Sequence, residues 1–260
     1  MSRGLNEILD KATNSHNLAE RIKKNTQGTE DIFSSWTDSL FVSLNYSNVL
    51  DICCGTGNQI VKYATNKKVK NITGIDISEG SLNFSLSRLS ELNSTAMIDL
   101  KNISMDLFFE KRHQKYDLIS CFYGLYYSKN IKKLISQMIN CTEDGGVILI
   151  VGPYGENNAS FFGLIEEHYK IPDLVKKSAT SFMGDDVLPE LSMQTRVQMK
   201  TLVNKIYFYS SDELVNYWRA TTFYNFTHEK AVRLDIDSYF VKHDFFIIEK
   251  HIIAFIATKI

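Results

Sequence analysis

The first strongly apolar segment of the chain ends in side chains that suit a ligand site. Segment 49–58 (VLDICCGTGN) contains Asp51, and Gly55 and Gly57 follow its apolar residues. Glycine lets the backbone turn sharply and approach a ligand closely, and α/β sheets bind ligands beyond the carboxyl ends of their strands. The segment therefore predicts a strand and a turn that hold a nucleotide-like ligand.

A second acid stands in the next apolar run. Asp76 follows Gly74 and Ile75 in segment 71–77. A carboxylate at the end of an adjacent strand can accept hydrogen bonds from both hydroxyls of a ribose, by the same geometry as in dinucleotide-binding enzymes. We therefore expect ligand contacts from two neighbouring strands.

The elements that must position these residues alternate along the middle of the chain. Strand-like runs alternate with helical patterns from Asn48 to Val151, which predicts a parallel sheet covered by helices. The predicted strands occupy residues 48–53, 71–77, 98–104, 116–123 and 146–151, and the predicted helices residues 59–65, 81–92 and 131–140. Asn58 is the expected cap of the first of these helices.

The pattern changes after Pro153. Residues 154–205 show helical patterns and no convincing strand. Extended runs then occupy residues 205–209 and 247–258, with a helix at 211–220 that Ser210 or Ser211 is expected to cap. Because mixed sheets often carry an antiparallel edge, we predict that the two late strands pair as a hairpin on the edge of the sheet.

The ordered set of motifs resembles the class I S-adenosylmethionine-dependent methyltransferases. The matching segments are Asp51 with 55–57, then Asp76, 105–107, 116–119 and the turn at 144–146. The resemblance covers roughly residues 35–151 and the closing strands. It implies an α/β fold with a Rossmann-like seven-stranded mixed sheet, parallel except for one antiparallel edge hairpin, flanked by helices and with a helical substrate cover. One departure is visible, because the family usually has glycine where this chain has Cys53.

The resemblance also implies a cofactor, S-adenosyl-L-methionine, which is released as S-adenosyl-L-homocysteine. The residues expected to bind it are Asp51, Cys53, Gly55, Thr56, Gly57, Asp76, Ile77, Met105, Asp106, Leu107 and Phe122. Of these, Asp51 would hold the methionine portion, Asp76 the ribose and Asp106 the adenine amino group. An alternative for Asp106 is that it caps a helix. The four cysteines lack the paired spacing of a zinc site, so we expect reduced thiols and no metal.

The acceptor side is expected to draw on the end of the fourth strand and on the segment after the fifth. Tyr126 and His168 are the candidate catalytic residues, and Tyr123, Tyr127, Tyr154 and Asn157 the candidate substrate-binding residues. His168 falls in a helix-like stretch, 161–169, and is the candidate general base for a hydroxyl acceptor; the alternative is a surface histidine. The aromatic cluster at 122–127 can equally be core, and the loop before residue 158 can simply be a turn capped by Asn158.

Charge and length restrict the partners. The chain has 260 residues, with 29 Lys and Arg against 30 Asp and Glu, so it offers no net attraction to nucleic acid. No run approaches the ~18 apolar residues of a membrane span, and the amino terminus lacks a signal-peptide core. We expect a cytoplasmic protein that acts on a small molecule without membrane association, with a homodimer as an open possibility.

We expect an N-terminal helical lid over residues 1–40 and a methyltransferase domain over residues 41–260, with a helical substrate-cap insertion at 154–205. An apolar stripe of Leu5, Ile8, Leu9 and Ala12 belongs to the lid, and Trp36 is expected to pack across the cofactor or within the core.

The expected reaction is in-line SN2 transfer of a methyl group to a small polar metabolite, such as a headgroup, sugar precursor or natural-product intermediate. Nitrogen is favoured over oxygen as the acceptor atom because the sequence shows no evident base. Alternatives are an RNA or protein methyltransferase and a cofactor-binding subunit without activity. A nicotinamide-dependent oxidoreductase is disfavoured, because Ile60 stands where its third glycine is expected.

Overall fold

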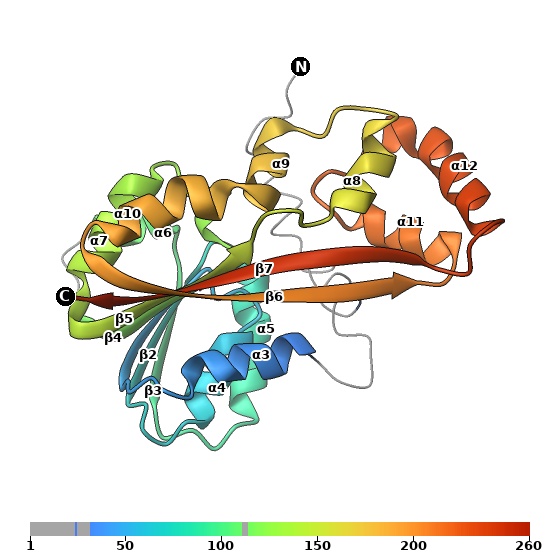
Figure 1. The fold of residues 1–260 in the computed structure, drawn as a ribbon. Coiled ribbons are helices and arrows are strands. Elements are labelled where there is room, and N and C mark those ends of the chain that lie inside the picture. The colour runs from blue at the N-terminus through green and yellow to red at the C-terminus, as the bar shows by residue number, and fades with distance from the viewer. Residues whose placement is uncertain (1–23, 25–31, 111–113) are drawn as a thin grey trace. The chain divides into compact units, whose positions relative to one another are not determined.

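The computed structural model describes residue 24, residues 32–110 and residues 114–260. These residues form a seven-stranded sheet with the order β3-β2-β1-β4-β5-β7-β6. The strands are β1 (Asn48–Ile52), β2 (Asn71–Asp76), β3 (Met97–Asn102), β4 (Tyr116–Phe122), β5 (Thr142–Pro153), β6 (Thr195–Phe208) and β7 (Phe246–Lys259). Strands β1 to β5 pair in parallel, and β6 and β7 run antiparallel at the edge (Figure 1). This confirms the predicted mixed sheet.

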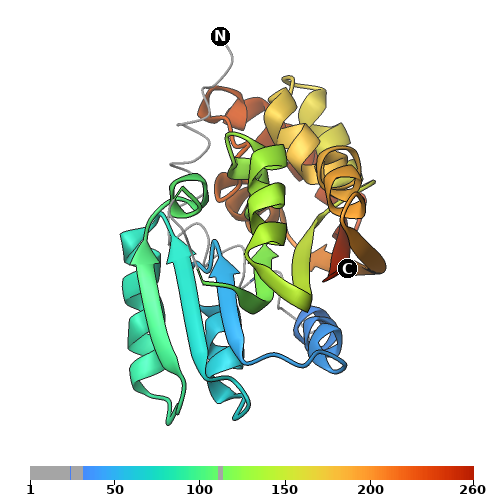
Figure 2. The same ribbon diagram turned by 90° about the vertical axis from the view of Figure 1, so that its left-hand side faces the viewer.

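The central strands are strands because apolar residues fill both of their faces. In β1 every residue after Asn48 is buried, and β5 is buried from Ile148 to its end. Parallel strands covered by helices on both faces need such continuous apolar runs. Figure 2 shows the arrows of β1, β2 and β3 pointing the same way, so their carboxyl ends meet at one edge of the sheet.

Three helices follow the strands as predicted, with small differences at their ends: α4 (Asn58–Thr65), α5 (Glu79–Ser90) and α7 (Ile131–Asn140). A short helix that was not predicted, α6 (Met105–Phe108), follows β3. Helix α4 packs on β1 and β2, and α5 on β2 and β3. The prediction that Asn58 caps α4 is wrong. Gly57 is the capping residue, in a left-handed conformation, while the Asn58 side chain accepts a hydrogen bond from the Arg88 guanidinium at 2.7 Å.

One compact part of the chain, which we call the sheet unit, comprises residues 39–152, 182–201 and 253–260. It includes the π-helix η2 (Met183–Val187) and α10 (Leu188–Ser192), and both of these contact α7. Strand β6 begins at Thr195, not at Lys205 as the sequence predicted. The last residues of the segment expected to be helical are therefore strand.

Of the described residues, the second compact part, the helical unit, comprises residue 24 and residues 32–38, 153–181 and 202–252. Its described helices are α8 (Ala159–Glu166), α9 (Asp173–Thr180), α11 (Ser211–Arg219), the 3-10 turn η3 (Phe226–His228) and α12 (Glu229–Phe240). Its core is aromatic, with the Phe161 ring centroid 5.7 Å from that of Phe223. Ser210 caps α11, which confirms one of the two predicted alternatives. Asn158 precedes α8 but makes no side-chain capping bond.

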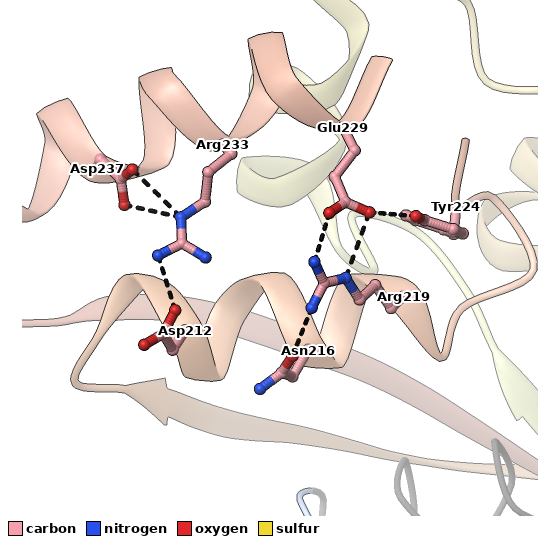
Figure 3. A network of polar contacts seen from close by, with 7 residues as sticks. All are labelled: Asp212, Asn216, Arg219, Tyr224, Glu229, Arg233 and Asp237. Carbon is pink, nitrogen blue, oxygen red and sulfur yellow. Dashed lines mark hydrogen bonds and ion pairs between the residues drawn. The ribbon is translucent and has the colours of Figure 1, made fainter. Parts of the chain in front are cut away.

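A polar network joins α11 to α12 in the helical unit (Figure 3). Glu229 accepts hydrogen bonds from Arg219 and from the Tyr224 hydroxyl. Arg233 contacts Asp212 at 2.7 Å and Asp237 at 3.0 Å. Every charged group drawn in this network faces an opposite charge, and the Arg219–Glu229 and Arg233–Asp212 pairs link α11 to α12.

Helix α3 (Ile32–Phe41) lies in the expected N-terminal lid, and the Phe33 and Trp36 ring centroids are 6.2 Å apart. The predicted stripe of Leu5, Ile8, Leu9 and Ala12 lies outside the described residues. None of the helices that the structure describes is long and apolar enough to cross a membrane. The roles of the lid and of the substrate-cap insertion stay predictions.

Candidate functional site

The turn after β1 is built from left-handed backbone. Gly55 has φ +51° and Gly57 φ +81°, conformations that favour glycine. A Cβ atom on Gly57 would lie 2.1 Å from Ser85 Oγ, so a side chain there would collide with α5. At Gly55 the nearest atom to such a Cβ among the described residues is Cys53 O at 3.9 Å, so those residues leave the space beside it open. The turn is therefore closed on the helix side and open at Gly55.

Asp76 at the end of β2 is bonded directly to this turn. Its Oδ2 accepts a hydrogen bond from the Gly55 N–H at 2.9 Å, and its Oδ1 accepts one from the Ser78 N–H at 2.8 Å. Burial raises the pKa of Asp76, and hydrogen bonds from the backbone N–H groups of Ser78, Gly55 and Ile77 oppose that rise. A carboxylate has about four acceptor sites, so three backbone donors leave capacity for a further hydroxyl donor.

Asp51 lies beneath the turn, fully enclosed by the sheet unit. Ser120 on β4 donates a hydrogen bond to Asp51 Oδ1 at 2.6 Å, and the Tyr63 hydroxyl of α4 donates one to Ser120 Oγ at 2.9 Å. Burial, with a smaller contribution from the nearby charge of Asp76, raises the pKa of Asp51 to about 7. The Asp51 carboxyl group therefore changes between its protonated and ionised forms near neutral pH. Its expected contact with the methionine portion of a cofactor stays a prediction.

Asp106 connects two loops at the same edge. Its oxygens accept hydrogen bonds from Ser128 Oγ at 2.6 Å and from the Lys129 N–H at 3.1 Å. Ser104, not Asp106, caps α6, so the capping alternative is wrong. The arrangement fastens the start of α6 to the segment after β4, and an adenine contact by Asp106 remains a prediction.

Apolar side chains flank these acids. Ile77 after β2 is 47% exposed and Leu107 in α6 is 54% exposed, whereas Met105 is buried. Large apolar groups left in solvent at the end of a sheet are suited to contact a flat ring. Together with the open space at Gly55 and the remaining acceptor capacity of Asp76, they fit an adenosyl ligand. Among the residues that the structure describes, no group of three or more potential metal ligands is found.

The end of β4 and the segment after it present four partly exposed aromatic side chains, Phe122, Tyr123, Tyr126 and Tyr127. The Phe122 ring stacks on Phe41, with centroids 6.5 Å apart. The Tyr126 centroid lies 4.6 Å from that of Tyr127 and 5.9 Å from that of Phe182. None of the four is buried as fully as the central strands are.

Phe182 and Met183 were missed by the sequence reasoning. Met183 packs so closely on the end of β5 that a Cβ on Gly152 would lie 2.9 Å from its Sδ. Phe182 contacts Tyr126. No motif marks these two residues, and only the three-dimensional structure brings their π-helical segment to the strand ends.

The remaining predicted acceptor residues lie in the helical unit. His168 follows α8 and its Nε2 lies 2.8 Å from Asp235 Oδ2 of α12, an acidic partner that the sequence did not reveal. The Tyr154 N–H donates to His251 O at 3.1 Å, and Asn157 is buried. His168 lies just beyond the end of its helix, not within it. The catalytic and binding roles of these three residues stay predictions.

Comparisons with known proteins agree with this geometry. A sequence profile described as a methyltransferase domain matches residues 5–229. A demethylmenaquinone methyltransferase of Leptospira interrogans is 26% identical over 39% of this chain, and the match spans 41% of that relative's length. A ubiquinone biosynthesis O-methyltransferase of Pseudomonas aeruginosa is 24% identical over 66% of this chain and 73% of its own. The YcgJ structure from Bacillus subtilis shares the fold, with a TM-score of 0.60 and 14% identity over 86% of this chain and 97% of its own.

Proposed function

Since this chain belongs to the class I S-adenosylmethionine-dependent methyltransferase family, we propose that it transfers a methyl group from S-adenosylmethionine to a small polar metabolite. The acceptor atom is a nitrogen or an oxygen, and the transfer is an in-line displacement. The bound cofactor supplies an activated methyl group, so the protein's main task is to hold the acceptor in line.

One observation carries the proposal. The Gly55 N–H of the turn after β1 bonds to the carboxylate of Asp76 after β2. This bond holds together the two features that the sequence assigned to one ligand, the glycine turn and the ribose-binding acid. The Asp76 oxygens then accept the ribose hydroxyls, while Ile77 and Leu107 cover the base.

The chain's own residues have separable tasks in this proposal. The ionised carboxylate of Asp51 attracts the positively charged end of the methionine portion electrostatically, with the backbone of the turn between the two groups. Asp106 holds the segment after β4 in place through Ser128 and Lys129. Tyr126 contacts Phe182 and orients the acceptor.

Acceptor choice falls to the residues that the chain adds to the cofactor-binding sheet. We assign Tyr154, Asn157 and His168 of the helical unit to acceptor recognition, with His168 as the base where the acceptor is a hydroxyl. The contact of His168 with Asp235 supports that role, because a carboxylate can hold an imidazole ring in one orientation. The name of the Pseudomonas relative supports oxygen as the acceptor atom, whereas the sequence alone favoured nitrogen.

Binding and turnover test the proposal separately. Calorimetry should show that the wild-type chain binds S-adenosylhomocysteine and does not bind NADH more tightly. Cofactor with a labelled methyl group, incubated with a panel of amine and hydroxyl metabolites, should then label one class of acceptor. Tighter binding of NADH would overturn the proposal. Binding without labelling of any small molecule, but with labelling of RNA or protein, would overturn the acceptor class alone.

A further inference from the structure

Cys53 has a backbone conformation that side chains other than glycine rarely adopt. Its φ is +56°, in the left-handed region, and it directly precedes the turn that carries Gly55. A non-glycine residue in this region is strained, and such strain persists only where surrounding contacts hold it. The contacts around Cys53 should therefore explain why a thiol stands at this position.

The side chain of Cys53 fills a space that Gly124 leaves open. A Cβ atom on Gly124 would lie 2.5 Å from Cys53 Cβ and 2.6 Å from Cys53 Sγ. Both distances are shorter than real side chains tolerate, so only one of the two residues can carry a side chain here. Gly124 has φ −126°, which alanine can adopt, so its lack of a side chain follows from the space and not from the backbone angle.

A second thiol borders the same space. Ile52 pairs with Cys121 in the register of β1 and β4, and a Cβ atom on Gly124 would lie 2.6 Å from Cys53 Sγ and 3.1 Å from Cys121 Sγ. Cys121 is fully buried. The Cys53 side chain therefore points toward β4 and away from the open side of the turn at Gly55.

We propose that Cys53 is a positioning residue of the cofactor turn and that Gly124 is its steric counterpart. The proposal rests on the proposed function, since it assigns the turn to the cofactor. The thiol sets the separation between two strand exits, one carrying Gly55 and the other carrying Tyr123 and Tyr126. In this way a single side chain fixes the cofactor-binding turn relative to the aromatic segment assigned to the acceptor.

The test is a double-mutant cycle on the full-length chain, with the dissociation constant of S-adenosylhomocysteine and the thermal unfolding temperature of the ligand-free protein as readouts. The variants are Gly124→Ala, Cys53→Gly and the two together. Gly80→Ala is the matched control, because no atom in the described part of the chain lies within 4 Å of a Cβ on Gly80 of α5. Cys141→Ala controls for loss of a thiol remote from the turn.

Gly124→Ala should weaken binding by about tenfold or more, the scale of coupling between residues in contact. Adding Cys53→Gly should restore the affinity to within about threefold of the wild-type value, with Cys121 Sγ, 3.1 Å from the new Cβ, yielding slightly. Neither control should change it. A double variant that binds no better than Gly124→Ala would overturn the inference.

A purely structural role is distinguished by the second readout. If Gly124→Ala lowers the unfolding temperature but leaves the affinity unchanged, Cys53 supports the fold and does not position the turn, and the proposal is wrong. If wild-type protein fails to bind S-adenosylhomocysteine, the proposed function fails, and the positioning role fails with it. In that case the steric pairing of Cys53 and Gly124 is still measured by the unfolding temperatures of the cycle.

Discussion

Asp51 in the sheet unit and Glu229 in the helical unit are both hydrogen-bonded acids, yet their surroundings shift their pKa values in opposite directions. Burial raises the pKa of Asp51 to about 7, and the neutral hydroxyl of Ser120, which donates to Asp51, opposes that rise only in part. Arg219 and Tyr224 lower the pKa of Glu229. The sheet unit thus keeps the Asp51 carboxyl group at a cost to stability, whereas the Glu229 carboxylate of the helical unit helps to fasten two helices. Groups kept against a stability cost are candidates for function.

The largest expected effect is the pH dependence of stability caused by Asp51. Because its pKa is higher in the folded chain than the ordinary 3.8, the stability that it contributes is present below pH 3.8 and is lost as the pH rises to about 7. That loss approaches roughly 4 kcal/mol for a shift of this size. Urea unfolding should show wild-type stability falling relative to Asp51→Asn as the pH rises through this range. A constant difference between the two proteins would contradict the buried, raised carboxyl.

The substitution Asp76→Ala should have the next largest effect. It removes the acceptor of the Gly55 and Ser78 N–H groups and the acceptor expected for the ribose, and should weaken S-adenosylhomocysteine binding by about 1 to 3 kcal/mol. Asp99→Ala is the matched control, because Asp99 on β3 is exposed and pairs with Lys101. Calorimetry that finds equal affinity for wild type and Asp76→Ala would remove Asp76 from the site.

Replacing one tyrosine by phenylalanine in each unit compares the sheet unit with the helical unit through the same chemical change. Tyr126→Phe removes a hydroxyl from the segment after β4 and should lower methyl transfer about three- to tenfold at little cost in cofactor affinity. Tyr224→Phe removes the hydroxyl that bonds Glu229 and should reduce stability without affecting turnover. Steady-state rates and calorimetry on both variants separate the two roles. Equal loss of turnover and of cofactor affinity in Tyr126→Phe would place this residue against the cofactor instead.

Glu229→Gln should give the smallest effect. The pairs with Arg219 are partly exposed, so the loss of stability should be about 0.5 to 1 kcal/mol. The pKa of Glu229 is lowered in the folded chain, so its contribution is present above the ordinary value of 4.5 and is lost as the pH falls below it, opposite in sign to Asp51. Thermal unfolding of the variant at pH 7 and in acid checks both points, and a loss at pH 7 as large as that in acid would argue against the ionised pair.

Local patterns predicted the fold well where the chain is periodic and buried. Helix α7 has the bounds that the sequence indicated, because Leu134, Ile135, Met138 and Ile139 repeat at helical spacing. The first half of β6 was missed because most of its residues are exposed and Arg196, Gln198 and Lys200 interrupt any apolar run. An edge strand gains its order from a neighbour and not from its own composition.

The residues of the candidate site likewise divide into those that local sequence patterns predicted and those that they did not. Gly55, Gly57 and Asp76 were recognisable because they are adjacent to predicted strand ends. The partners that give them their chemistry were not, since Ser120 lies 69 residues from Asp51, and Asp235 lies 67 residues from His168. Contacts between segments so far apart depend on the register of strands and helices. The pairing of Cys53 with Gly124 belongs to this second class, although Cys53 itself was visible as a departure from the family.

Tyr123 gives the end of β4 a property that matters for engineering. It has φ +56°, and its N–H donates to Val151 O at 2.8 Å. Glycine would relieve that strain, so a screen that selects only for heat resistance should favour Tyr123→Gly. The substitution would also delete an aromatic ring assigned to the acceptor. Stability-guided evolution of this protein would therefore tend to remove its acceptor site unless turnover is selected at the same time.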